Sequence, residues 1–318
     1  MKVVVVGIAN QQTALPVEGF PIEYSAARLV PNQIRHTVGG VGFNVARTLS
    51  ALGHMVALAS PLGEDYPAAM VDAEAYRFTI STHLCRRDLV RTPRSVVLFD
   101  HAGRRQVNVD LADAAEFVFS PEHLAPDLFR AKLVVLGNLD MVRPLIGPVL
   151  ERGRRLAVDL QDVQGPDNPY DEEFLQADYL NMSNELVRGS EREVMLALRA
   201  KSRARVLTMT LAEHGALVLS REMDEPVHVP APAVEPYNTA GAGDIAFAKF
   251  LHATLKLRED PVTAAARAVA VASSYVASDA SLGPQTPDQL RAVLGLSPRA
   301  ETAASAPEIP WNAFATES

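Results

Sequence analysis

Short apolar runs that recur along the chain constrain its fold more than any other feature. They lie at residues 3–6, 56–59, 133–136, 156–160 and 206–209. Segments with apolar residues at helical spacing separate them. Strands that are buried on both faces and alternate with helices form a parallel sheet with helices on each side. The sequence therefore predicts an α/β fold with three layers, α/β/α, around a mostly parallel central sheet.

Two segments interrupt this alternation. Residues 11–37 carry several prolines among apolar residues, and residues 91–110 contain two strand-like runs around the turn at 101–104, which is typical of a β-hairpin. The stretch after Gly283 is rich in proline and contains the only tryptophan, Trp311. We therefore divide the chain into a discontinuous core of residues 1–10, 38–90 and 111–296, an inserted β element of residues 11–37 and 91–110, and a tail of residues 297–318.

Composition excludes several classes of function. The net charge is −8 and no basic run is present, which argues against a nucleic-acid or anionic membrane partner. No apolar run approaches the length of a membrane span, and the start of the chain does not read as a secretion signal. Cys85 is the only cysteine, so it cannot form an intrachain disulfide, and it fits a reducing compartment. We expect a cytoplasmic protein.

A glycine-rich motif, Asn-Thr-Ala-Gly-Ala-Gly-Asp, occupies residues 238–244 and precedes an apolar run typical of a helix. Glycine permits a sharp turn, and the unpaired amides of a first helical turn attract an anion. The backbone of Gly241, Ala242 and Gly243 would form this anion hole. Asp244 would then stand where an attacking hydroxyl loses its proton in phosphoryl transfer. The alternative is a tight turn in which Asp244 only caps a helix.

A second glycine-rich motif, Gly-Gly-Val-Gly-Phe-Asn, occupies residues 39–44 and also opens a helical pattern. Gly39 and Gly40 would let the backbone approach a ligand, and Asn44 would offer an amide side chain. The alternative is that the glycines only let the helix pack against a strand. Elsewhere, Asp159 ends one of the apolar runs, where it would line either the nucleotide region or a solvated loop.

The two motifs together, with matching stretches at residues 3–10, 61–65 and 206–216, resemble the ribokinase-like carbohydrate kinases of the phosphofructokinase B type. The resemblance extends from Val3 to about Gly283. It implies an ATP-dependent kinase that transfers the γ-phosphate to a hydroxymethyl group of a sugar or nucleoside, with Asp244 as general base. It also implies that the inserted β element folds over the substrate as a lid, and it allows a homodimer formed through that lid.

The resemblance assigns further residues to the site. Mg²⁺ would accompany ATP, with Glu185 as a metal residue acting through water. Substrate-binding residues would be Asn10, Gln12, Gly39, Gly40, Asn44 and Asp110. Nucleotide-binding residues would be Asn184, Thr210, Gly215 and Thr239.

The chain departs from the family pattern at several positions. Asn238 replaces an Asp that often helps to hold a monovalent cation, which argues against activation by potassium. Gln12 replaces an Asp that grips substrate hydroxyls, and Lys249 has no counterpart that suggests a role. The chain is also similar to pseudouridine kinases, so a nucleoside kinase is an alternative. A non-catalytic sugar or nucleoside sensor on a kinase fold is an alternative of another class, although the intact residues 241–244 favour catalysis.

Overall fold

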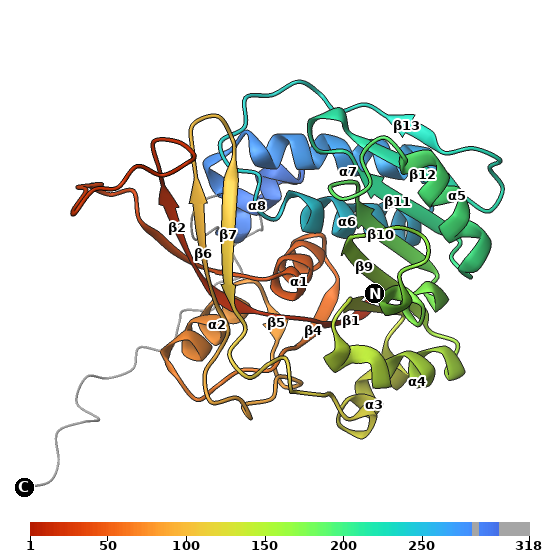
Figure 1. The fold of residues 1–318 in the computed structure, drawn as a ribbon. Coiled ribbons are helices and arrows are strands. Elements are labelled where there is room, and N and C mark those ends of the chain that lie inside the picture. Colours follow the sequence, from red (N-terminus) through yellow and green to blue (C-terminus); the bar gives the residue numbers. More distant parts are fainter. Residues whose placement is uncertain (282–285, 299–318) are drawn as a thin grey trace, which may run out of the picture.

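A nine-stranded sheet runs through the centre of the molecule in the computed structural model, which describes residues 1–281 and 286–298 (Figure 1). Its strand order is β13-β12-β11-β10-β9-β8-β1-β4-β5. All pairings from β11 to β5 are parallel, whereas β12 and β13 are added antiparallel at one edge. The strands are β1 (Lys2–Val6), β4 (Met55–Ala59), β5 (Ile80–Ser81), β8 (Leu133–Gly137), β9 (Arg155–Asp162), β10 (Tyr179–Ser183), β11 (Val206–Thr210), β12 (Ala216–Ser220) and β13 (Val227–Val229).

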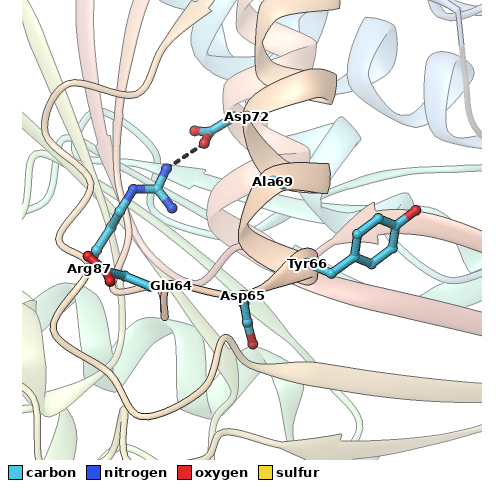
Figure 2. Close-up of a pocket in the computed structure, with 6 residues that line it drawn as sticks. All are labelled: Glu64, Asp65, Tyr66, Ala69, Asp72 and Arg87. Atoms are coloured by element: carbon cyan, nitrogen blue, oxygen red, sulfur yellow. Dashed lines mark hydrogen bonds and ion pairs between the residues drawn. The ribbon is translucent and has the colours of Figure 1, made fainter. Parts of the chain in front are cut away.

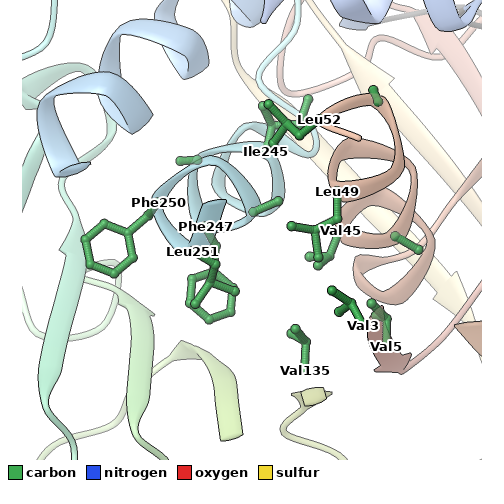
Figure 3. Close-up of a cluster of buried hydrophobic side chains, with 14 of the residues drawn as sticks. Val3, Val5, Val45, Leu49, Leu52, Val135, Ile245, Phe247, Phe250 and Leu251 are labelled. Carbon is green, nitrogen blue, oxygen red and sulfur yellow. The ribbon is translucent and has the colours of Figure 1, made fainter. Parts of the chain in front are cut away.

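Helices cover both faces of this sheet. Because successive side chains of a strand point to opposite faces, Val3 and Val5 of β1 pack into one core, and Val4 and Val6 pack into the other. Figure 3 shows part of the first core, where α1 and α6 meet over β1 and β8. The first core contains α1 (Val41–Ala51), α2 (Tyr66–Arg77), α6 (Ala242–His252), α7 (Pro261–Val276) and α8 (Pro287–Val293). The second contains α3 (Pro121–Arg130), α4 (Ile146–Glu151) and α5 (Glu191–Lys201).

A second sheet of four strands, in the order β3-β2-β6-β7, lies beside the first (Figure 1). All four strands fall in, or at the border of, the two segments that interrupt the apolar runs. We call this second sheet the lid. Its strands are β2 (Asn10–Pro16), β3 (Arg35–Gly39), β6 (Arg94–Phe99) and β7 (Arg105–Asp110).

The predicted α/β/α fold with a mostly parallel sheet and a small second sheet is confirmed, and each predicted run lies in a strand. Strand β10 did not stand out as an apolar run because Asn181 interrupts it. In the part of the chain that the structure describes, no helix is both long and apolar enough to cross a membrane. Of the predicted tail, residues 299–318 lie outside the described residues.

Candidate active site

The carboxyl ends of the parallel strands meet the N-termini of α1 and α6 at one edge of the central sheet. Strand order reverses at β1, which pairs with β4 on one side and with β8 on the other. Ligands of open α/β sheets bind at such a reversal, outside the carboxyl ends of the strands. Helix α1 reaches this edge of the sheet because Gly42 packs directly on the end of β1. A Cβ on Gly42 would lie 2.6 Å from the carbonyl carbon of Gly7.

The N-terminus of α6 presents free backbone amides. Gly241 precedes the helix in the left-handed conformation, with φ of 79°, which a residue with a Cβ rarely adopts. The amide of Ala242, which was predicted to belong to the anion hole, instead donates to the carbonyl of Thr239 at 3.3 Å. In the described part of the chain, the amides of Gly241, Gly243 and Asp244 donate to no backbone carbonyl. Together with the helix dipole, these amides can receive an anion.

Asp244 is held at this helix start by Asn44 of α1. The Nδ2 of Asn44 donates to the Oδ2 of Asp244 at 2.6 Å, so the two glycine-rich motifs meet through their polar side chains. Burial raises the pKa of the Asp244 carboxyl, and the hydrogen bond from Asn44 and the charges of Arg47 and Arg105 oppose this rise. A base with a raised pKa accepts a proton more readily, which suits general-base catalysis.

A second buried carboxylate, Asp159 of β9, lies close enough to Asp244 to interact with it electrostatically. Its Oδ1 accepts from the Nδ2 of Asn181 at 3.1 Å, and the Oδ1 of Asn181 accepts from the hydroxyl of Thr208 at 2.8 Å. These bonds form a polar ladder across three neighbouring strands. Burial, followed by the negative charge of Asp244, raises the pKa of Asp159 to about 7. The sequence signal for this residue was its place at the end of a buried apolar run.

Four of the predicted substrate residues surround the start of α1. Gly39 and Gly40 leave room for their neighbours: a Cβ on Gly39 would lie 2.6 Å from the Oε1 of Gln12, and one on Gly40 would lie 2.4 Å from the Ile8 carbonyl. Asn10 donates to the hydroxyl of Ser95 at 2.7 Å. A small cavity adjoins them, lined by Gln12, Thr37, Val38, Gly39, Asn44, Arg47, Ala240, Tyr275, Ala280 and Ser281.

Two buried acceptor atoms beside this cavity have no protein partner. The Oδ1 atoms of Asn10 and Asn44 are buried and make no hydrogen bond to any described residue. An unpaired buried acceptor carries a desolvation cost that a hydroxyl donor would remove. These two atoms therefore suit a ligand with several hydroxyl groups.

Asn238 has a structural role in the motif. Its Nδ2 donates to the carbonyl of Ser281 at 2.7 Å, and its Oδ1 accepts from the amide of Ala240 at 3.1 Å. Both ends of the amide are thus engaged in holding the residue 238–241 turn against the turn at 279–281. Thr239, the next residue, accepts a hydrogen bond from Arg105 of the lid.

Three other predicted residues lie at the carboxyl ends of β10 and β11. The amide of Asn184 donates to the carbonyl of Thr210 at 3.1 Å, and its side chain donates to Glu191 at 2.8 Å. Gly215 has φ of +98° in the turn before β12, where a Cβ would lie 2.1 Å from the carbonyl oxygen of Val229. This close approach to the backbone explains the glycine.

The structure does not bring Asp110 and Glu185 into this cluster. Asp110 accepts from the amide of Ala112 at 2.9 Å and lies 3.7 Å from Arg91. Strand register places it on the lid face opposite to Gln12. The side chain of Glu185 is 58% exposed and forms an ion pair with Arg188 at 2.7 Å.

A larger hollow lies elsewhere, on the surface at the start of α2 (Figure 2). Its volume is about 500 Å³, and an ion pair between Arg87 and Asp72 crosses part of it. It shares no residue with the cavity beside Asn44, so it is separate from the candidate active site. Its lining residues are Glu64, Asp65, Tyr66, Ala69, Asp72 and Arg87.

Comparison with known proteins identifies a family. The profile of the pfkB family carbohydrate kinases matches residues 1–287, which is most of the chain. The chain belongs to the pfkB family. One similar protein is the bifunctional protein HldE of Nitrobacter hamburgensis. It is 29% identical to this chain over 267 residues, which cover 76% of this chain and 53% of HldE. This pfkB chain spans about half the length of the HldE proteins it matches.

Two solved structures are similar over nearly their whole length. The microbiome-derived acarbose kinase Mak1 is 25% identical, with a TM-score of 0.80, covering 92% of this chain and 98% of Mak1. Ribokinase from Arabidopsis thaliana, solved with ribose and ATP, is 21% identical, with a TM-score of 0.72, covering 93% of this chain and 99% of the ribokinase. The second likeness supports the ribokinase-like fold.

Proposed function

We propose that this pfkB protein is an ATP-dependent kinase that transfers the γ-phosphoryl group of ATP to a hydroxymethyl group of a sugar. One observation carries the proposal. The half-buried carboxylate of Asp244 accepts a hydrogen bond from Asn44 at the N-terminus of α6, where backbone amides are free. A base and an anion site at one point are what phosphoryl transfer to a hydroxyl requires.

In the proposed reaction, the acceptor lies between Asn44 and the lid, with its hydroxyl against Asp244. Because Asn44 occupies Oδ2 of Asp244, the other carboxylate oxygen is the one that takes the hydroxyl proton. The acceptor oxygen forms a bond to the γ-phosphorus, the bond between that phosphorus and the β,γ-bridging oxygen breaks, and ADP leaves. The amides of Gly241 and Gly243 stabilise the negative charge on the transferred group.

The residues present also fit magnesium bound together with ATP. Asp159 is a buried carboxylate whose pKa is raised by burial and then by the negative charge of Asp244, and a divalent cation nearby would offset that repulsion. Among the described residues no three His, Cys, Asp or Glu side chains form a metal cluster, which fits an ion held largely by phosphates and water. When bound, magnesium neutralises phosphate charge. We assign Asp159 to its water shell ahead of the exposed Glu185.

We do not assign a monovalent cation to Asn238, since protein groups occupy both ends of its amide. The remaining predicted assignments stay proposals. We propose that the acceptor is bound by Asn10, Gln12, Gly39 and Gly40. We propose that the nucleotide is bound by Asn184, Thr210, Gly215 and Thr239.

The test is ADP release with magnesium and ATP across a panel of acceptors. The panel contains ribose, deoxyribose, fructose, acarbose, adenosine, inosine, uridine and pseudouridine. Acceleration by one acceptor, with a phosphorylated product detected by mass spectrometry, supports the kinase. Binding of an acceptor without any turnover contradicts it and identifies the sensor instead.

A nucleoside acceptor, including pseudouridine, is the second candidate. Val107 and Val109 are 45% and 57% exposed, and strand register places them on the same lid face as Gln12. An apolar surface beside an amide side chain suits the flat face and polar edge of a base. Turnover of a nucleoside and of no free sugar in the same panel would select this candidate.

We also propose that the partner of the lid is a second copy of this chain. On the outer lid face Val96 is 39% exposed, and Leu15 and Leu98 on the same face are only half-buried. Light scattering after gel filtration should show a dimer that Val96→Glu converts to a monomer, because a charge in an apolar interface is costly. A wild-type monomer would contradict the proposal.

We propose no nucleic-acid or membrane partner for this protein. We also propose a cytoplasmic location, where ATP is available.

A further inference from the structure

The tip of the lid hairpin touches the segment that leads into the anion hole. The Nη1 of Arg105, the first residue of β7, donates to the hydroxyl of Thr239. Two residues earlier, Gly103 lies so close to Pro236 that a Cβ would approach its Cγ to 2.8 Å. Two contacts therefore join the hairpin to the segment of residues 236–239. Figure 1 shows the end of the β6–β7 hairpin beside this part of the chain.

Strand register places Arg105 on the inner face of the lid. Arg105 is opposite Phe99 in β6, and Phe99 is in register with Pro16 of β2. Registered residues share a face, and every second residue of a strand does too. Pro16 is four positions from Gln12, which lines the cavity beside Asn44. The guanidinium of Arg105 and the proposed acceptor therefore lie on the same side of the lid.

Arg105 differs from the other arginines of the hairpin region in its partner. Arg91, Arg94 and Arg104 each face a carboxylate, those of Asp110, Asp65 and Asp100 respectively. Arg105 forms no ion pair in the described ranges, 1–281 and 286–298. Its positive charge instead reaches the site, where it opposes the rise that burial causes in the pKa of Asp244. A guanidinium that forms no ion pair, near free amides, favours an anion.

We propose that Arg105 is a further phosphate-binding residue of this site and contacts the phosphoryl group in transfer. The inference rests on the proposed function. Arg105 holds two parallel donors in a planar fork, which matches two oxygens of one phosphoryl group. The bonds that form and break are those of the proposed reaction, and Arg105 donates hydrogen bonds without losing a proton. Because Arg105 belongs to the lid, it links the position of the lid to the chemical step.

The test compares Arg105→Ala and Arg105→Lys with Arg35→Ala in the full chain. Arg35 is an exposed lid arginine at the far end of β3 and forms no ion pair among the described residues, so it controls for loss of a lid charge. We expect Arg105→Ala to lower kcat about 10²- to 10³-fold, as for loss of one donor to a developing charge. The acceptor KM should change little. Arg105→Lys should recover part of the loss, because it keeps the charge without the fork.

Two further measurements separate phosphate contact from a purely structural tether. Free guanidinium ion at non-denaturing concentration should restore part of the activity of Arg105→Ala, because it can occupy the place of the lost group. Affinity for the magnesium complex of β,γ-imido-ATP, measured by calorimetry, should fall in Arg105→Ala and stay unchanged in Arg35→Ala. This binding measurement requires no turnover.

The outcomes distinguish this inference from the kinase proposal. If wild type binds the nucleotide in an Arg105-dependent way but phosphorylates no acceptor, the phosphate contact stands and the kinase proposal fails. If Arg105→Ala matches wild type in kcat and nucleotide affinity, Arg105 does not bind phosphate. A loss that neither lysine nor guanidinium restores, with nucleotide affinity unchanged, also overturns the inference and leaves Arg105 as a tether.

Discussion

The hydrogen bond between Asn44 and Asp244 is the residue contact on which the proposed chemistry depends most. Replacing Asp244 by Asn keeps a similar shape but removes the base. We expect Asp244→Asn to fold normally and to lower kcat by roughly 10²- to 10⁴-fold, the range for loss of a general base. Steady-state ADP release measures the effect, and thermal unfolding is the control for folding. Near-normal turnover would exclude Asp244 as the base.

Asp159 is expected to act through magnesium. Asp159→Asn should keep the hydrogen bond with Asn181, which can pair with an amide oxygen, but it removes the buried charge. We expect activity or apparent magnesium affinity to fall about 10- to 100-fold, as for other residues that orient a metal's surroundings. Magnesium titration of ADP release checks this. Glu185→Gln should have a smaller effect, since Glu185 is exposed and paired with Arg188; the reverse order would restore Glu185 as the metal residue.

At this scale the sequence indicated two residues that the fold brings together, but not the individual contacts of the site. The glycine-rich motifs pointed to Asn44 and Asp244, and the structure brings the two side chains together. Nothing in the sequence distinguishes Arg105 from Arg104, because only the register of the hairpin decides which side chain faces inward. Asp110 failed to join the cluster for the same reason: it is one position out of phase with Val109 on the inner face.

At the scale of elements, the start of α1 is set by its close packing on the end of β1. A Cβ on Gly42 would lie 2.6 to 2.9 Å from backbone atoms of Gly7, which cannot move aside as a flexible side chain can. We expect Gly42→Ala to lower the free energy of unfolding by about 1 to 3 kcal/mol, the usual cost of overpacking. It should also lower kcat, because Asn44 is two residues away.

Urea unfolding measures this effect, and Gly147→Ala in α4 is the matched control. Apart from its chain neighbours and its own helix backbone, a Cβ on Gly147 would meet no atom within 4 Å, so alanine there should change the free energy of unfolding by less than about 1 kcal/mol. Equal stability of the two variants would show that α1 does not depend on this contact.

The elements themselves were largely predictable. Each predicted apolar run became a strand because β-branched residues buried on both faces leave few alternatives. The edge strand β13 was not predicted, since two of its three residues are exposed and it lacks that continuous apolar signal. Strand β12, between β11 and β13, was missed although Ala216–Leu219 is a continuous apolar run. The hairpin was predicted from its turn residues, but its docking on residues 236–239 depends on contacts distant in sequence.

For the whole molecule, a buried histidine pair makes stability depend on pH. The Nε2 of His54 lies 2.9 Å from the Nδ1 of His252, where the ends of α1 and α6 meet. Burial and neighbouring positive charges, including Lys256, lower the pKa of each imidazole from 6.5 to about 4. The unfolded chain therefore binds protons more readily than the folded chain between these values. Stability is fully present above pH 6.5 and is lost as the pH falls toward 4.

We expect the free energy of unfolding to fall by about 2 kcal/mol for one such histidine between pH 7 and pH 5. Urea unfolding at the two pH values measures it. His54→Gln should reduce the difference, and replacing the exposed His214 by Gln should not. A difference that both variants leave unchanged would locate the pH dependence elsewhere in the molecule.

The bond between Asn44 and Asp244 joins positions 200 residues apart. Neither half of the polypeptide holds both partners. A nascent chain therefore places the proposed base in working position only after the segment beyond residue 244 has left the ribosome and α6 has docked on α1. Enzymatic competence and completion of the fold should consequently arise in a single event during synthesis.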